Sequence, residues 1–261
     1  MSKLEKILLV FDSYGWCFEN ECLGIQKYSK YNCSVKPFNP IDLSILNEFD
    51  LIYFSTPSIA VPYISTPGRT YRDEKGRRRL YTDPHYTPPK KTKIVIGIAS
   101  LAECGRIQRN ADAFVGVSRE LADLARLKFP DIPVEYIPDG VDPEIFYPLN
   151  LKHESFKVGW VGNFPRAEKR TYLLKRLDYE VHIKADRLLE PNVSREPMRR
   201  FYNEMDVILL VSSSEGCSLV PLEAGACKTA FVGTRTGTVI DYIPDHWLVP
   251  CEPENETVRL I

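Results

Sequence analysis

Short apolar segments recur along the chain and alternate with amphipathic ones. Five of these segments occupy the first half, at residues 6–11, 50–55, 93–99, 112–118 and 134–138. Four more lie beyond residue 155, at 156–162, 179–184, 206–211 and 229–233. Their length and β-branched residues predict buried strands, whereas "SRELADLARLKF" repeats apolar residues at helical spacing behind Ser118, a typical helix N-cap. Strands that alternate with helices predict an α/β protein with parallel sheets covered on both faces.

The segment 137–150 separates the two series of strands and is rich in Pro, Gly and Asp. Such residues interrupt regular structure, which favours a connection between two compact units. We therefore predict a first Rossmann-like domain over 1–138, a linker over 139–154 and a second Rossmann-like domain over 155–261. Open parallel sheets bind ligands beyond the carboxyl ends of their strands, so we expect the two sheets to face a central ligand cleft.

One long segment, residues 56–93, follows neither pattern. It is rich in Pro and in basic residues, and we expect a long loop on the acceptor side of the first domain. Between residues 68 and 93 it carries nine Lys or Arg and three Asp or Glu. Its acceptor-side candidates are Arg77, Arg78, Arg79 and His85. Cations interleaved with aromatic residues suit nucleic acid or a phosphate-bearing glycan as acceptor, although a solvated loop explains the same composition equally well.

Composition excludes several classes of protein. Of the 261 residues, 44% are apolar and 26% are charged, with a net charge of -1, which is typical of folded globular chains. The seven cysteines are odd in number and include no C-x-x-C pair, so neither a disulfide framework nor a metal site is expected. No apolar run approaches the roughly 20 residues that cross a bilayer, and no secretion signal is evident. We expect a cytoplasmic protein, with peripheral membrane contact as the alternative.

Two glutamates, Glu215 and Glu223, flank a small apolar run directly after the strand 206–211. The residues "SSSEG" predict a turn, and a helix should run from Ser218 as its N-cap to about Cys227. The unpaired backbone N–H groups at the start of such a helix form an anion site. The residues of this site are Gly216, Cys217, Ser218 and Leu219. Glu223 is then placed to accept hydrogen bonds from a ribose; the alternative is a solvated helix residue and a turn carboxylate near the helix dipole.

The segment "SSSEGCSLVPLEAGAC" resembles the Ser-x-x-Glu-Gly and E-x7-E signature of the retaining GT-B glycosyltransferases of the group-one, or family-four, type. Further segments resemble that family in the same order: "ADAFVGVSRELADL" (111–124), "IPDGVDPEIFYP" (137–148) and "VGWVGNFPRAEKRTYLL" (158–174). The resemblance covers the chain from roughly residue 93 onward. It implies the GT-B architecture and retaining, metal-independent transfer from a UDP-, GDP- or dTDP-sugar to a glycan, a lipid-linked glycan or a modified nucleic-acid base. No cofactor beyond that donor is implied.

Positions that match the family motifs carry its implied roles. Glu215 is implied to contact the donor sugar near its reacting carbon, and Glu223 to hold the ribose hydroxyls. Gly162 is implied to bring the backbone close to the diphosphate, whose charge Arg166 and Lys169 neutralise. With Glu215, these two cations are the candidate catalytic residues. The same roles predict that Glu223→Gln weakens donor binding with little loss of fold.

The chain also departs from the family pattern. Asn163, a donor-site candidate by position, stands where the family has Arg, and Lys169 aligns only with one inserted residue. The segment "GIAS" (97–100) lacks the His that the family often has in this half. The chain ends soon after "WLVPCEPENETVRLI", so we expect a compact or truncated version of the family. These departures leave a non-catalytic nucleotide-sugar-binding protein as an alternative, whereas a sugar-nucleotide epimerase is less favoured by the E-x7-E and Gly-Val-Asp segments.

Overall fold

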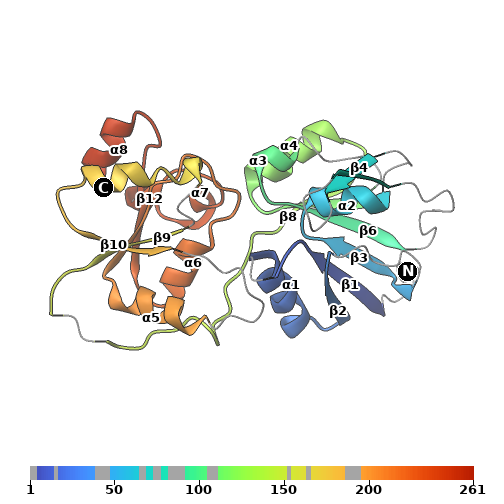
Figure 1. The fold of residues 1–261 in the computed structure, drawn as a ribbon, viewed down its shortest axis with the longest axis horizontal. Helices are drawn as coiled ribbons and strands as arrows, with labels where there is room; N and C mark the ends of the chain where they lie inside the picture. The colour runs from blue at the N-terminus through green and yellow to red at the C-terminus, as the bar shows by residue number, and fades with distance from the viewer. Residues whose placement is uncertain are drawn as a thin grey trace. The chain divides into compact units, whose positions relative to one another are not determined.

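The computed structural model divides the chain into two compact units, Met1–Ile137 and Pro138–Ile261 (Figure 1). Each unit is built around a parallel sheet, which confirms the predicted α/β class. The structure describes residues 5–14, 17–38, 48–64, 69–72, 78–81, 92–104, 111–151, 154–162, 166–185 and 195–261. No helix within these ranges is both long and apolar enough to cross a membrane.

The first unit has a six-stranded parallel sheet with the order β2-β1-β3-β6-β7-β8. Its strands are β1 (Lys6–Phe11), β2 (Asn32–Pro37), β3 (Leu51–Phe54), β6 (Lys93–Ile98), β7 (Ala113–Gly116) and β8 (Val134–Tyr136). The helices of this unit are α1 (Cys17–Tyr28), α2 (Pro57–Ile64), α3 (Leu101–Cys104) and α4 (Arg119–Lys128). The central strands are continuous apolar runs because both faces are covered, and Leu8, Phe54 and Ile96 are fully buried.

Helix α4 begins where the sequence predicts. Ser118 has an extended backbone, and its Oγ accepts a hydrogen bond from the N–H of Leu121 at 3.2 Å. This contact satisfies one of the N–H groups that a helix start leaves unpaired. The apolar face of α4 is buried at Leu121, Ala122 and Ala125, in agreement with the helical spacing.

The second unit has a five-stranded parallel sheet with the order β10-β9-β11-β12-β13. Its strands are β9 (Val158–Gly162), β10 (Val181–Ala185), β11 (Val207–Leu210), β12 (Ala230–Thr234) and β13 (Leu248–Val249). Its α-helices are α5 (Glu196–Glu204), α6 (Leu219–Ala226), α7 (Val239–Tyr242) and α8 (Glu254–Leu260). Its 3-10 helices are η2 (Ala167–Lys169), η3 (Thr171–Arg176) and η4 (Asp245–Trp247). All four strands predicted in this half are present, and β13 is an addition.

Both faces of the second sheet are covered (Figure 1). On one face, Ile208 packs in a cluster with Tyr202 of α5 and Ala224 of α6. On the other face, Trp160 is fully buried against side chains of η3, with apolar residues of α8 at the edge of the same cluster. The sheet is therefore anchored between two apolar layers, and its carboxyl edge presents the turns that carry the candidate residues.

The prediction of an unbroken loop over 56–93 is wrong for part of that segment. Residues Pro57–Ile64 form helix α2, and β4 (Arg69–Arg72) pairs antiparallel with β5 (Arg78–Tyr81). Pro57 opens the helix at a position where its missing N–H costs little, so this proline was not a helix breaker. Strands of four residues are too short to show a periodic pattern, which is why the hairpin was missed.

Part of the segment predicted as a linker packs on the second unit. Phe146 is buried, and its ring centroid lies 5.9 Å from that of Tyr202. The N–H of Leu149 donates to Asn203 Oδ1 at 2.6 Å, and Asn203 Nδ2 donates to the carbonyl of Tyr147 at 3.1 Å. These contacts fasten the segment to α5 and make it part of the second unit.

Candidate functional site

Two of the three candidate catalytic residues lie together beyond the carboxyl ends of β9 and β11. Lys169 Nζ lies 2.6 Å from Glu215 Oε1, although the two residues are 46 positions apart in the sequence. Their side chains are only 14% and 11% exposed, so both charges are largely removed from water. Because β9 and β11 are neighbours in a parallel sheet, the turns that follow them meet at the same edge. The sheet topology therefore produces this ion pair.

Hydrogen bonds from two directions hold the turn that carries Glu215. The N–H of Ser213 donates to the carbonyl of Glu168 at 2.8 Å, which ties the turn to η2. The N–H of Glu215 donates to Thr236 Oγ1 at 3.0 Å, which ties it to the segment after β12. The Glu215 carboxylate is thus held beside Lys169 by backbone contacts as well as by charge.

The third candidate catalytic residue, Arg166, points elsewhere. Its Nε lies 2.6 Å from Glu168 Oε1, and half of its side chain is exposed. Gly162 ends β9 as predicted, and a Cβ at this position would lie 2.8 Å from the indole ring of Trp160. The absence of a side chain here thus serves the packing of Trp160. Asn163, Arg77 and His85 lie outside the described residues, and Arg78 and Arg79 lie on strand β5.

Helix α6 starts at the predicted place. Ser218 is its N-cap residue, and its side chain makes no capping hydrogen bond to the helix. Just before it, the carbonyl of Gly216 accepts a hydrogen bond from the N–H of Thr238 at 3.0 Å. The N–H groups of Cys217, Ser218 and Leu219 lie at the amino end of α6, where the helix dipole favours an anion.

Glu223 is buried inside the second unit, with both carboxylate oxygens engaged. Arg195 Nη2 donates to Glu223 Oε1 at 2.7 Å, and the hydroxyl of Tyr202 donates to Oε2 at 2.7 Å. The Arg195 guanidinium also lies 5.7 Å from the ring centroid of Phe146. Arg195 and Tyr202 were not predicted from the sequence. They contact Glu223 only because α5 packs on α6, and neither belongs to a local motif. The ribose role of Glu223 stays a prediction.

Comparison with known protein families gives a match over the second unit. Residues 144–259 match the family model described as glycosyl transferases group 1. The match covers most of the second unit, which is therefore similar to the group 1 glycosyltransferases. A search of curated proteins by sequence gave no match.

Solved structures extend the likeness in fold to the whole chain. Starch synthase IV from Arabidopsis thaliana matches with a TM-score of 0.62 at 9% identity, over 98% of this chain and 90% of that chain. The lipopolysaccharide outer core galactosyltransferase WaaB matches with a TM-score of 0.56 at 12% identity, over 97% and 88%. Sucrose-phosphate synthase from Thermosynechococcus elongatus matches with a TM-score of 0.54 at 15% identity, over 98% and 88%. The chain therefore has the GT-B fold, with two Rossmann-like units.

Gly237 supports the turn that carries Glu215 and should not tolerate a side chain. Its φ is +54°, and a Cβ would lie 2.5 Å from the carbonyl oxygen of Gly216 and 2.6 Å from that of Glu215. We expect Gly237→Ala to lower the free energy of unfolding by about 2–4 kcal/mol, because the backbone around Glu215 must shift. Urea unfolding measures this loss. Gly225→Ala is the matched control, since nothing lies within 4 Å of its added Cβ, and equal effects would contradict the packing argument.

Besides Glu215, the carboxyl of Asp139 lies near the start of α6, and the sequence did not predict it. The thiol of Cys217 donates a hydrogen bond to the Asp139 carboxylate and accepts one from Thr238 Oγ1 at 3.2 Å. Burial raises the pKa of Asp139 to about 6, and burial beside Asp139 raises the pKa of Cys217 to about 12. The Cys217 thiol is therefore protonated at neutral pH, and the Asp139 carboxyl titrates just below neutral pH.

Stability of the second unit should depend on pH through Asp139. Its pKa is higher in the folded chain than the ordinary 3.8, so the folded state binds this proton more tightly. Lowering the pH from neutral to below 6 should therefore stabilise the folded state through this group. We expect Asp139→Asn to melt about 3 °C above the wild type at pH 7.5 and to keep only about half of that advantage at pH 5, because pH 5 lies between the two pKa values. Thermal unfolding at both pH values tests this; a difference that is the same at both would contradict it.

Proposed function

We propose that this chain is a retaining glycosyltransferase that moves a sugar from a nucleotide-diphosphate sugar to an acceptor. The observation that carries the proposal is the buried Lys169–Glu215 pair beside the start of α6, inside a unit that matches the group 1 glycosyltransferases. One of the similar structures, the catalytic domain of starch synthase IV, was solved with ADP and acarbose bound. A nucleoside diphosphate is the product that a nucleotide-sugar donor leaves behind.

We propose a role for each member of the pair. The diphosphate would lie at the amino end of α6, where backbone N–H groups and the Lys169 ammonium neutralise the charge that develops as the donor bond breaks. The Lys169 contact would then pass from Glu215 to the diphosphate. The released Glu215 carboxylate can accept hydrogen bonds from hydroxyl groups of the donor sugar. Because these groups supply the positive charge, we propose that no metal ion takes part.

The transfer itself follows from the resemblance to retaining enzymes. The bond between the anomeric carbon and the departing phosphate oxygen breaks, and the acceptor oxygen bonds to the same face of that carbon. The acceptor proton passes to the departing phosphate oxygen. This chain's residues bind and orient the reactants and stabilise the leaving group, and none of them acts as a nucleophile.

A nucleotide-sugar screen with mass-spectrometric detection tests this function. The purified chain is incubated with UDP-, GDP- and dTDP-sugars, and both bound donor and released nucleoside diphosphate are followed. Selective binding with release supports a transferase, and the anomeric configuration of the transferred sugar, read by NMR, tests retention. Binding without release, in the presence of phosphorylated and neutral glycans and of DNA as acceptors, would indicate a non-catalytic nucleotide-sugar-binding protein. No binding to any donor by the folded chain would contradict the proposal.

A specific observation favours a second candidate function, a protein that binds nucleotide sugars without transferring the sugar. The Arg166 guanidinium is engaged by Glu168, so in this state Lys169 is the cation that accompanies Glu215. A site with one cation holds a diphosphate less firmly than a site with two. If the chain only binds nucleotide sugars, Arg166→Gln should leave donor affinity unchanged. In a transferase, Arg166 leaves Glu168 when donor binds, and the same variant should lower turnover.

For the acceptor, we propose a phosphate-bearing molecule, a nucleic acid or a phosphorylated glycan. The surplus of six positive charges between residues 68 and 93 supports this choice. In the acceptor panel, use of phosphorylated acceptors that falls steeply with added salt is the expected result. Equal use of neutral glycans would count against it.

A further inference from the structure

Arg170 follows Lys169 and combines two features that are rare in an arginine. Its backbone lies in the left-handed region, with φ at 43°, at the junction between η2 and η3. Its side chain is 4% exposed. Left-handed backbone in a residue other than glycine is uncommon and persists only when surrounding contacts enforce it. The side chain shows what those contacts are.

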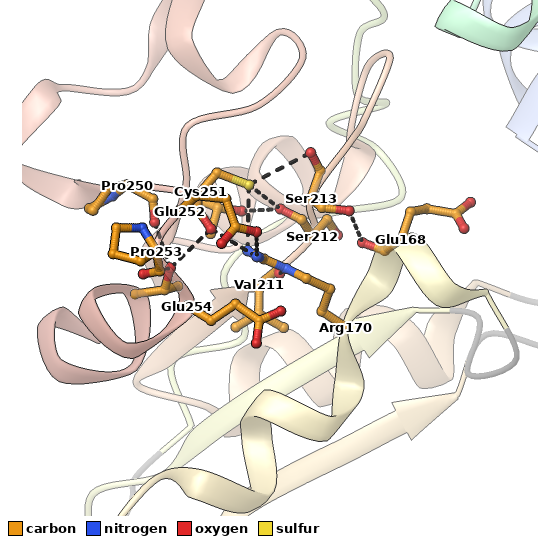
Figure 2. A network of polar contacts seen from close by, with 12 residues as sticks. Glu168, Arg170, Val211, Ser212, Ser213, Pro250, Cys251, Glu252, Pro253 and Glu254 are labelled. Carbon is orange, nitrogen blue, oxygen red and sulfur yellow. Dashed lines mark hydrogen bonds and ion pairs between the residues drawn. The ribbon is translucent and has the colours of Figure 1, made fainter.

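The Arg170 guanidinium joins three separate segments of the second unit (Figure 2). Nε donates to the carbonyl of Val211 at 2.8 Å, just beyond β11. Nη1 donates to the carbonyl of Cys251 at 2.8 Å and lies 3.0 Å from Glu252 Oε1. The planar fork of arginine suits several acceptors at fixed positions, which a lysine ammonium cannot match. The junction of η2 and η3 is thereby clamped to β11 and to the segment after β13.

The Arg170 contacts, which we call the clamp, and one further hydrogen bond hold the chain on both sides of Lys169. On the amino side, the carbonyl of Glu168 accepts the N–H of Ser213 at 2.8 Å. On the carboxyl side, Arg170 holds the carbonyl of Val211, two residues before Ser213. Both neighbours of Lys169 in the sequence are therefore hydrogen-bonded to the short segment 211–213, which leads directly to Glu215. Figure 2 shows both attachments in the same network.

We propose that Arg170 is a positioning residue, whose buried guanidinium holds the η2 turn in the conformation that aims Lys169 at Glu215. The consequence for donor binding rests on the proposed function, in which Lys169 neutralises the diphosphate. The positioning itself does not, because the Lys169–Glu215 contact exists independently of any donor. The two parts can therefore be tested separately.

The reactivity of the Lys169 amine measures the positioning without any nucleotide. An amine-acylating reagent should modify Lys169 slowly, since this side chain is 14% exposed and ion-paired. Cleavage at glutamate yields the fragment 169–180, which also contains the exposed Lys175 as an internal reference. Mass spectrometry then gives the Lys169 to Lys175 labelling ratio for each variant.

Loss of the clamp should expose Lys169. We expect Arg170→Ala and Arg170→Gly each to raise the labelling ratio by about tenfold, with Arg170→Lys in between. Arg176→Gln is the matched control, because Arg176 contacts Asn255 and Glu254 of the C-terminal segment but none of the residues around Lys169. Its ratio should not change. An unchanged ratio in Arg170→Ala would overturn the proposal.

Arg170→Gly separates the side chain from the backbone. Glycine accepts a φ of 43° without strain, so a protected Lys169 in this variant would mean that backbone conformation alone orients the turn. That result would overturn the role of the guanidinium. If the Ala and Gly variants lose their near-ultraviolet circular dichroism, Glu252→Lys takes their place, because it sets a like charge near Arg170 from a side chain that is 66% exposed. A folded Glu252→Lys with increased labelling supports the clamp, and one with unchanged labelling contradicts it.

Donor affinity provides the second readout. If Arg170 acts through Lys169, the losses caused by Arg170→Lys and by Lys169→Met should not add in the double variant. Full additivity would contradict the positioning role. If no variant, and not even the wild type, binds any donor, the proposed function fails while the labelling result still decides the role of Arg170.

Discussion

Lys169→Met should lower turnover of the donor by about 10²–10³-fold, because it removes the cation that we propose neutralises the departing diphosphate. The same change leaves the Glu215 carboxylate, 11% exposed, without its partner at 2.6 Å. Breaking a buried pair on one side costs about 3 kcal/mol of folding free energy. The variant should therefore be both less active and less stable, and released nucleoside diphosphate and urea unfolding measure the two effects.

A double variant separates these two effects. In Lys169→Met with Glu215→Gln, no charge is left unpaired in the buried position, so much of the stability should return while turnover stays low. Lys175→Met is the matched control, since it makes the same replacement at an exposed position of η3. Turnover that survives in Lys169→Met, or returns in the double variant, would show that Lys169 has no part in the reaction.

Glu223→Gln should affect folding as well as donor binding. The sequence predicted little loss of fold, but the structure places this carboxylate in the interior, where it accepts hydrogen bonds from Arg195 and Tyr202. A glutamine keeps the shape and leaves the Arg195 guanidinium, 14% exposed, without a negative partner. We expect the free energy of unfolding to fall by about 2–4 kcal/mol. Urea unfolding, followed by donor titration under conditions where the variant is folded, measures both quantities.

Two variants show whether Glu223 also serves the ribose. Tyr202→Phe removes only one hydroxyl and should cost about 1 kcal/mol, with donor affinity little changed. Arg195→Met combined with Glu223→Gln removes both charges, so stability should partly recover. If donor affinity recovers with it, Glu223 is a structural residue and its ribose role is contradicted. If stability recovers and affinity stays low, the ribose role stands.

Much of the architecture was predictable because the signals are local. The nine predicted strands are present. Buried parallel strands are continuous apolar runs, and the polar residues that flank each run mark where the strand ends. The cap at Ser118 follows from a residue type that satisfies a helix end, whereas Ser218 marks the start of α6 at Leu219 without a capping hydrogen bond. The edge strand β2 was missed because its exposed face interrupts the apolar run, and β13 because it has only two residues.

The sequence by itself determined the α/β class and the two-unit division, because spacing and composition encode short-range structure. Spacing also drew attention to Glu215 and Glu223, whereas Lys169 became a candidate through the family resemblance. Only the tertiary structure decided their partners. Lys169 meets Glu215 because two neighbouring parallel strands end at the same edge, and Glu223 meets Arg195 because α5 packs on α6. In the sequence Arg170 is one more basic residue, yet folding buries it against two distant segments, the end of β11 and the residues after β13. Contacts between distant segments depend on how the sheet orders its strands, and no local pattern specifies that order.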